Sequence, residues 1–248
     1  MPQNIDLILP CYNPPADFVG MVEFYLRNLK AFYPDRQLNL FVVNDGSTQN
    51  FTDIQIRQLH SFQESVRIIS YPSNWGKGYA LRKAVAETSS PLIVYTDYDF
   101  PFRVESIIKL IEELDKDADI VLVSRNHDYL RVLPLTRKFY SLMSKQLNRI
   151  FLRLKYSETQ GGLKGFNLKG KEIFMRTTIN EFLFDTEFIY RASMQKGITI
   201  VNIKGITRED IRPNKVPIRV VKRELFNFFK ILRIKKLNNI IKFRPGGI

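Results

Sequence analysis

The stretch that decides the fold is IVYTDYDFP, residues 93–101, in which an apolar run ends in two carboxylates one residue apart. The apolar residues predict a buried strand that ends near Thr96. In an extended backbone, side chains at i and i+2 leave the same face, so Asp97 and Asp99 could reach one hard divalent cation. Two aspartates can equally be a solvated strand end, and other parts of the chain have to decide between these interpretations.

Length and composition favour one catalytic domain with an appendage. The chain has 248 residues, of which 44% are hydrophobic, enough for one substantial core. Its single cysteine, Cys11, cannot form an intramolecular disulfide, which fits a reduced, cytoplasmic setting. The first residues lack a basic stretch followed by an apolar one, and no apolar run reaches the length of a membrane span. We therefore expect neither export nor membrane insertion.

The net charge of +13 is concentrated in two segments. Residues 215–244 contain ten Lys or Arg and one acid, and residues 131–155 contain seven and no acid, so the rest of the chain is net negative. Apolar residues recur at helical spacing in both segments, over 139–154 and again after Pro217. Each segment is either a helix packed on the core or a helix lying in an anionic membrane interface.

Five short apolar runs alternate with helical segments along the chain. The runs are residues 5–10, 38–43, 66–70, 92–96 and 120–123. This alternation predicts a Rossmann-like α/β fold, with a mainly parallel sheet covered by helices on both faces. Ligands bind beyond the carboxyl ends of the strands in such sheets. The polar groups that follow these runs should therefore share one rim: Tyr12 and Asn13, Asp45, Lys77, and the pair Asp97 and Asp99.

Each polar group has a functional and a structural interpretation. Asp45 could accept hydrogen bonds from a base or ribose, but Asn-Asp-Gly-Ser is also a good turn for backbone reasons. Lys77, between two glycines, could meet a phosphate together with helix N-terminal amides, or be a solvated lysine. Arg82 lies one turn inside the same helix and could project towards the same phosphates, or lie on the surface.

Four of these stretches occur in the order of a known family. LPCYN (9–13), VNDGS (43–47), NWGKGYALR (74–82) and TDYD (96–99) resemble the motifs of family 2 glycosyltransferases with the GT-A fold, over about residues 4–210. The resemblance implies a UDP- or GDP-sugar donor and a divalent metal, Mg or Mn, held by Asp97 and Asp99. It also implies that the donor is bound by Pro10, Tyr12, Asn13, Asp45, Lys77, Arg82 and Asp97.

Downstream stretches resemble one branch of that family. VSR (123–125), Arg137, ETQGGLKGF (158–166) and FDTE (184–187) are similar to the polyprenyl-phosphate sugar transferases, including dolichyl-phosphate glucose and mannose synthases. By this resemblance Arg125, Arg137 and Lys164 surround an acceptor phosphate or the donor diphosphate, while Gln160 and Asp185 face the sugar. The chain departs from the branch at 161–162, where Gly-Gly replaces a Cys of some relatives, and no membrane-spanning run follows the catalytic part.

The expected function is therefore an inverting, metal-dependent transfer of a hexose to an undecaprenyl or dolichyl phosphate at the inner face of the membrane. Asp99 would hold the cation that stabilises the leaving diphosphate. A phosphate acceptor needs no general base, whereas a sugar hydroxyl, the alternative acceptor, would need Asp185 or Glu187. We expect a catalytic domain over 1–212, a basic amphipathic segment over 213–248, and an anionic membrane surface rather than nucleic acid as partner.

Two other classes fit less well. A sugar-phosphate nucleotidyltransferase would require a glycine-rich phosphate loop after the first strand, where this chain has CYNPP, residues 11–15. A non-catalytic membrane- or nucleic-acid-binding module could use the basic tail, but it would need neither Asp45 nor the Asp97 and Asp99 pair.

Overall fold

The computed structural model describes residues 3–62, 65–125, 135–156, 159–210 and 218–242. Its strands are β1 (Ile5–Cys11), β2 (Leu38–Asp45), β3 (Val66–Tyr71), β4 (Leu92–Thr96), β5 (Ile120–Ser124), β6 (Leu163–Phe166) and β7 (Ile200–Lys204). Its helices are α1 (Phe18–Phe32), α2 (Asp53–Phe62), α3 (Lys77–Glu87), α4 (Val104–Asp115), α5 (Leu135–Phe151), α6 (Leu168–Met175), α7 (Phe184–Met194) and α8 (Ile218–Lys242). Among the described residues, no helix combines the length and the apolar character of a membrane span.

The strands form one seven-stranded sheet in the order β3-β2-β1-β4-β6-β5-β7. All neighbours are parallel except β6, which runs antiparallel to both β4 and β5. The five predicted strands and the mainly parallel sheet are thus confirmed. Sequence patterns missed β6 and β7, because β6 has only four residues with a glycine among them and β7 is mostly half-exposed or exposed.

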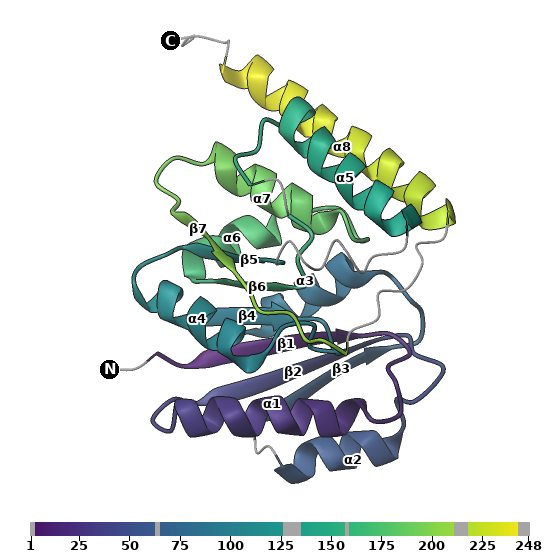
Figure 1. Cartoon of the computed structure of the whole chain (residues 1–248), viewed down its shortest axis with the longest axis vertical. Helices are drawn as coiled ribbons and strands as arrows, with labels where there is room; N and C mark the ends of the chain where they lie inside the picture. The colour runs from purple at the N-terminus through teal and green to yellow at the C-terminus, as the bar shows by residue number, and fades with distance from the viewer. Residues whose placement is uncertain (1–2, 63–64, 126–134, 157–158, 211–217, 243–248) are drawn as a thin grey trace.

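Helices cover both faces of the sheet and enclose one apolar core on each side (Figure 1). Buried side chains of α1 and α4 pack on one face, and those of α3, α6 and α7 pack on the other. The strands read as continuous apolar runs because both of their faces are covered. The first core extends to the sheet rim, where Tyr25 stacks on Phe100 with ring centroids 4.0 Å apart.

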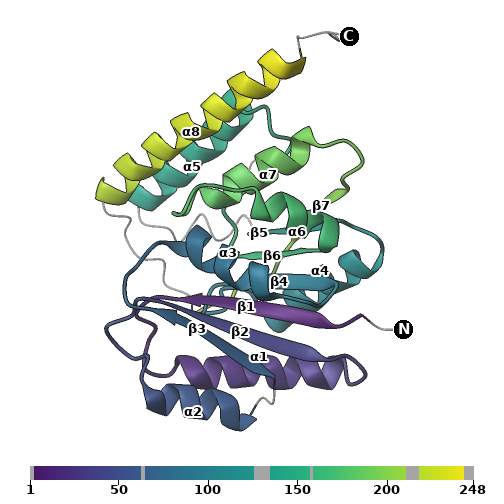
Figure 2. The ribbon, with the colours of Figure 1, turned by 180° about the vertical axis from the view of Figure 1, so that it is seen from behind.

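Helices α5 and α8 lie side by side at the end of the molecule remote from α1 and α2 (Figures 1 and 2). One face of α8 is buried and carries Glu224, Asn227, Phe228 and Ile231, at helical spacing. The ring of Phe228 also contacts that of Phe151, with centroids 6.1 Å apart.

The predicted apolar stripe over 139–154 is only partly buried. Leu154 is buried and Leu147 is partly buried against the core, but Ile150 is 56% exposed. Between Leu147 and Ile150, α5 buries the polar side chain of Asn148, which interrupts the stripe. The side chains of Phe139 and Leu237, which the apolar patterns also include, lie outside the described residues.

Candidate active site

The loops after β1 and β2 are tied together by Asn13. Its side-chain Oδ1 accepts hydrogen bonds from the backbone amides of Thr48 (2.8 Å) and Gln49 (3.2 Å), and its own amide donates to Ser47 Oγ (2.9 Å). Asn13 adopts a positive φ of 46°, a conformation that asparagine tolerates better than most residues. Pro10 is buried in β1, whereas Tyr12 is exposed beside this junction. The predicted meeting of these two strand ends is confirmed.

Asp45 is buried at the end of β2 and holds the turn that opens α3. Its two carboxylate oxygens accept hydrogen bonds from the backbone amides of Trp75 (2.8 Å) and Gly76 (2.9 Å). Gly76 has a φ of 99°, which only glycine adopts at low cost. Asp45 therefore positions the turn before Lys77, and its predicted contact with a nucleotide base stays a prediction.

Lys77 and Asp97 meet across the rim. The ammonium Nζ of Lys77 lies 2.5 Å from Asp97 Oδ1, and the side chains are 13% and 34% exposed. The amides of Gly78 and Tyr79 donate to Asn180 O (2.6 and 3.3 Å), which differs from the predicted role of helix N-terminal amides in phosphate binding. The Lys77 side chain therefore places a positive charge at this rim.

Asp97 and Asp99 come together through a turn and not, as predicted, through an extended backbone. β4 ends at Thr96, and the amide of Phe100 donates to Asp97 O (3.0 Å) while Phe100 has a φ of 43°. Burial, followed by the negative charge of Asp97, raises the pKa of Asp99 to about 6. The two carboxylates thus share one site, in which negative charge is incompletely balanced.

The donor atoms at this turn fit a hard divalent cation. Carboxylate oxygens are the ligands that Mg²⁺ and Mn²⁺ prefer, and a cation would relieve the repulsion between Asp97 and Asp99. The described residues contain no cluster of three His, Cys, Asp or Glu that could hold a metal ion. Water and ligand oxygens, such as those of a diphosphate, would complete the coordination of a cation held by this pair.

Gly162 leaves room for the Asp97 carboxylate. A Cβ atom at position 162 would lie 2.1 Å from Asp97 Oδ2, far inside van der Waals contact. The Gly-Gly sequence that departs from some members of the resembled branch therefore has a local physical reason here. Any side chain at position 162 would push the carboxylate from its place.

A buried ion pair lies directly beneath the rim. Lys164 Nζ contacts Asp185 Oδ1 (2.8 Å) and Gly161 O (2.5 Å), and the hydroxyl of Tyr95 donates to the same Asp185 oxygen (2.5 Å). Tyr95 and Lys164 are paired in register on β4 and β6. Burial lowers the pKa of Lys164, and Asp185 opposes that shift. Lys164 was predicted to meet a phosphate and Asp185 the sugar, but the structure pairs them with each other.

Glu187 and Arg82 both contact the segment that precedes α7. Glu187 is fully buried, accepts from the amides of Thr178 and Ile179 (2.8 Å each), and pairs with Arg191. Arg82 donates to Ile179 O (2.7 Å) and contacts the side chain of Asn180. Both side chains therefore fix the segment 177–180, and the predicted roles of Glu187 as a general base and of Arg82 near the donor phosphates stay predictions.

The remaining predicted residues lie near α5. Arg125 Nη2 donates a long hydrogen bond to Gln160 O (3.4 Å), and Gln160 Oε1 accepts from Ser144 (3.5 Å). Among the described residues, no group accepts a hydrogen bond from the buried Nε2 of Gln160. The predicted sugar contact of Gln160 therefore has an amide to donate. Arg137 belongs to α5, but its side chain lies outside the described residues.

Sequence reasoning missed three residues that shape the rim. Tyr95 stands two positions before Asp97, where its polar hydroxyl in an apolar strand was an available signal. Arg208 donates to Asp99 O (2.9 Å) and pairs with Asp210. Asn180 accepts from the start of α3 through its carbonyl. No local motif marks Arg208 or Asn180, because each acts through a contact distant in sequence.

Comparison with known proteins identifies relatives of this chain. The model of the family described as Glycosyl transferase family 2 matches residues 6–174. Glycosyltransferase AglD of Haloferax volcanii is 26% identical over 218 residues, covering 84% of this chain and 34% of that protein. A dolichyl-phosphate beta-glucosyltransferase of Saccharomyces cerevisiae is 24% identical over 258 residues, covering 96% of this chain and 76% of that protein. The chain thus spans about a third of the archaeal relative.

Solved structures share the fold at low sequence identity. Mannosyl-3-phosphoglycerate synthase from Rubrobacter xylanophilus superposes with a TM-score of 0.69 at 16% identity, covering 99% of this chain and 78% of that one. Glucosyl-3-phosphoglycerate synthase from Mycobacterium tuberculosis, solved with Mn²⁺, UDP and phosphoglyceric acid, gives a TM-score of 0.62 at 16% identity, covering 93% and 78%. The predicted GT-A fold is confirmed.

Proposed function

Because this chain belongs to glycosyltransferase family 2, we propose that it transfers a hexose from a UDP- or GDP-sugar to a polyprenyl phosphate, with inversion. The observation that carries the proposal is the pairing of Lys77 with Asp97 beside Asp99, at the carboxyl end of β4. The names of the relatives support the reaction class, since the yeast protein is called a dolichyl-phosphate glucosyltransferase. The structure from M. tuberculosis that resembles this chain was solved with Mn²⁺ and UDP.

The residues at the rim would have different roles in binding the donor. A divalent cation, Mg²⁺ or Mn²⁺, would supply Lewis-acid stabilisation of the leaving diphosphate when held by Asp97 and Asp99. Lys77 adds a positive charge that can move from Asp97 to a diphosphate oxygen as the donor binds. Asp45 keeps the turn at Trp75 and Gly76 in place and so fixes the backbone from which Lys77 projects.

The burial of the Asp185 and Glu187 carboxylates supports a phosphate as acceptor. A sugar hydroxyl has to lose a proton to a general base, whereas a phosphate monoester is already anionic at neutral pH. Asp185 is buried against Lys164 and Tyr95, and Glu187 is buried against Arg191 and two backbone amides. Neither carboxylate is placed as an open base. Transfer to a sugar hydroxyl is the second candidate function, and Asp185 would be its general base.

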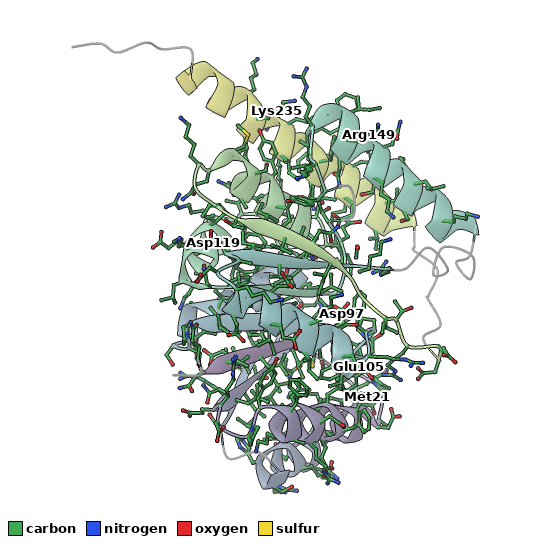
Figure 3. The ribbon with its side chains drawn as sticks, turned by 60° about the vertical axis from the view of Figure 1, so that its left-hand side comes forward. Met21, Asp97, Glu105, Asp119, Arg149 and Lys235 are labelled. Carbon is green, nitrogen blue, oxygen red and sulfur yellow. The ribbon has the colours of Figure 1, made fainter. Side chains whose placement is uncertain are left out.

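The exposed surfaces of α5 and α8 support the approach to a lipid. Large apolar side chains on these helices face solvent: Leu142, Ile150, Phe151, Leu225, Phe226 and Phe229. Basic side chains stand among them, including Arg149 and Lys235, which lie at the same end of the molecule in Figure 3. Apolar and cationic groups together suit an anionic bilayer. We infer peripheral association with the cytoplasmic face of a membrane. Asp97 lies near the middle of the molecule, between the end that carries Arg149 and Lys235 and the end near Met21 (Figure 3).

A donor and acceptor screen tests this function. Purified protein is mixed with UDP- or GDP-hexoses, Mn²⁺ or Mg²⁺, and either a polyprenyl phosphate or a set of sugar acceptors, and nucleoside diphosphate release is followed. Release that requires both the metal and the polyprenyl phosphate supports the proposal. Release that occurs only with sugar acceptors favours the second candidate. If neither kind of acceptor supports release, both candidate functions are contradicted.

A further inference from the structure

The buried face of α8 carries polar groups that contact the segment before α7. Glu224 is 2% exposed, and its Oε2 accepts a hydrogen bond from the backbone amide of Leu183 (2.9 Å). One turn along, Asn227 donates to Glu181 Oε2 (2.9 Å). Figures 1 and 2 show α8 and α5 on the outer side of α7. These contacts fix the register of α8 against residues 181–183, which apolar packing alone would leave free to slide.

The same segment is packed against the turn that presents Lys77. Asn180 O accepts from the amides of Gly78 (2.6 Å) and Tyr79 (3.3 Å), both in the first turn of α3. A Cβ atom on Gly76 would lie 2.6 Å from Asn180 O, so these two backbones touch. A shift of residues 180–183 would therefore move the start of α3. The chain of contacts runs from α8 through 180–183 to Gly76, Lys77 and Gly78.

We propose that Glu224 is a positioning residue for the donor site, holding residues 180–183 so that they fix the Gly76-Lys77-Gly78 turn. Seating of α8 on α7 is then a condition for tight binding of the donor diphosphate. This inference rests on the proposed function for the identity of the ligand, but not for the contacts. It links α8 to the donor site through the backbone contacts of residues 180–183.

Simple packing does not account for a carboxyl group at this place. Burial, with a smaller contribution from the charge of Glu181, raises the pKa of Glu224 to about 7, while the amides of Leu183 and Phe182 and the Arg223 guanidinium act in the opposite direction. Among the described residues, nothing donates to its buried Oε1. Burying this carboxyl costs free energy, and the hydrogen bond from the Leu183 amide to Oε2 offsets part of that cost.

The single tryptophan of the chain provides a readout at the far end of this path. Trp75 precedes Gly76, its amide is held by Asp45, and its ring is exposed. Acrylamide quenching of its fluorescence in the full chain therefore reports the mobility of the turn. Titration with Mn²⁺ and UDP or GDP measures diphosphate affinity. The variants are Glu224→Ala, Glu224→Gln and, as a matched control, Glu172→Ala, which removes an exposed glutamate from α6.

We expect Glu224→Ala to increase Trp75 quenching and to weaken nucleoside diphosphate binding about tenfold, since one lost buried hydrogen bond is worth about 1.4 kcal/mol. Glu224→Gln keeps an acceptor for the Leu183 amide and should remain within about twofold of wild type at pH 6, as should Glu172→Ala. Trp75 quenching and diphosphate affinity in Glu224→Ala equal to those of Glu172→Ala would overturn the inference, even if the melting temperature falls.

If Glu224→Ala does not fold, Glu224→Asp replaces it, since a side chain shorter by one methylene keeps the charge but withdraws from the Leu183 amide. Wild-type quenching in that variant would contradict the positioning role, and increased quenching would support it. If wild-type protein binds neither nucleotide, the proposed function fails, but the Trp75 measurement still decides whether Glu224 controls the turn.

Discussion

Replacing Gly162 by alanine should impair catalysis while leaving the fold almost intact. The added Cβ would lie 2.1 Å from Asp97 Oδ2, whereas ordinary contact begins at 3.4 Å. The carboxylate must therefore retreat by about 1.3 Å, which disrupts its ion pair with Lys77. A misplacement of about 1 Å in a catalytic group can cost about 100-fold in rate, so we expect a loss of that order in kcat.

The stability effect should be small by comparison. The Lys77 and Asp97 side chains are partly exposed, and pairs of this kind contribute at most about 1 kcal/mol. The assay is metal-dependent nucleoside diphosphate release, with thermal unfolding measured on the same preparation. Gly20→Ala is the control, because a Cβ there meets nothing within 4 Å and alanine suits the α1 helix. Activity of Gly162→Ala within about threefold of wild type, at an unchanged melting temperature, would refute this reasoning.

Four further variants, one of them a double substitution, separate the parts of the site. Asp99→Ala should abolish transfer in a folded protein, because losing a charged contact to the transition state costs several kcal/mol and each 1.36 kcal/mol is tenfold; retention of a third of the activity would exclude a metal-binding role. Asp45→Ala should raise the KM for the donor more than it lowers kcat, since the turn it holds serves ground and transition states alike; steady-state kinetics with a collapsed kcat and constant KM would contradict this. Burial raises the pKa of Glu224 from an ordinary 4.5 to about 7 in the folded protein, so between these values the folded state binds more protons than the unfolded state. The free energy of unfolding should therefore fall as the pH rises from 4.5 through 7, by about 3 kcal/mol at most. Urea unfolding at pH 5 and pH 8 should show that difference in wild type and a flatter profile in Glu224→Gln. Replacing Phe226 and Phe229, 62% and 61% exposed, by serine should weaken sedimentation with anionic vesicles at least tenfold at low salt, and unchanged sedimentation would remove the membrane from the proposal.

Much of the fold and the place of the site follow from the sequence. Apolar runs of five or six residues between helical segments predict strands, and their continuous hydrophobicity predicts a sheet covered on both faces. The carboxyl ends of parallel strands share one edge, so polar residues after strands can be assigned to one rim without knowing their contacts. That is why Asn13, Asp45, Lys77 and Asp97 could be grouped in advance, although they are spread over more than 80 positions.

Tertiary structure alone decided which partner each of these side chains has. The antiparallel insertion of β6 beside β4 sets Lys164 against Asp185 and Tyr95 and not at an open phosphate site. Glu187 and Arg82 turn towards residues 177–180 because side-chain direction depends on helix rotation, which local spacing does not specify. The contact of Glu224 with Leu183 joins residues 41 positions apart. Such pairings depend on how whole elements pack, because hydrogen bonds and ion pairs require positions accurate to a fraction of an ångström, which a sequence pattern does not encode.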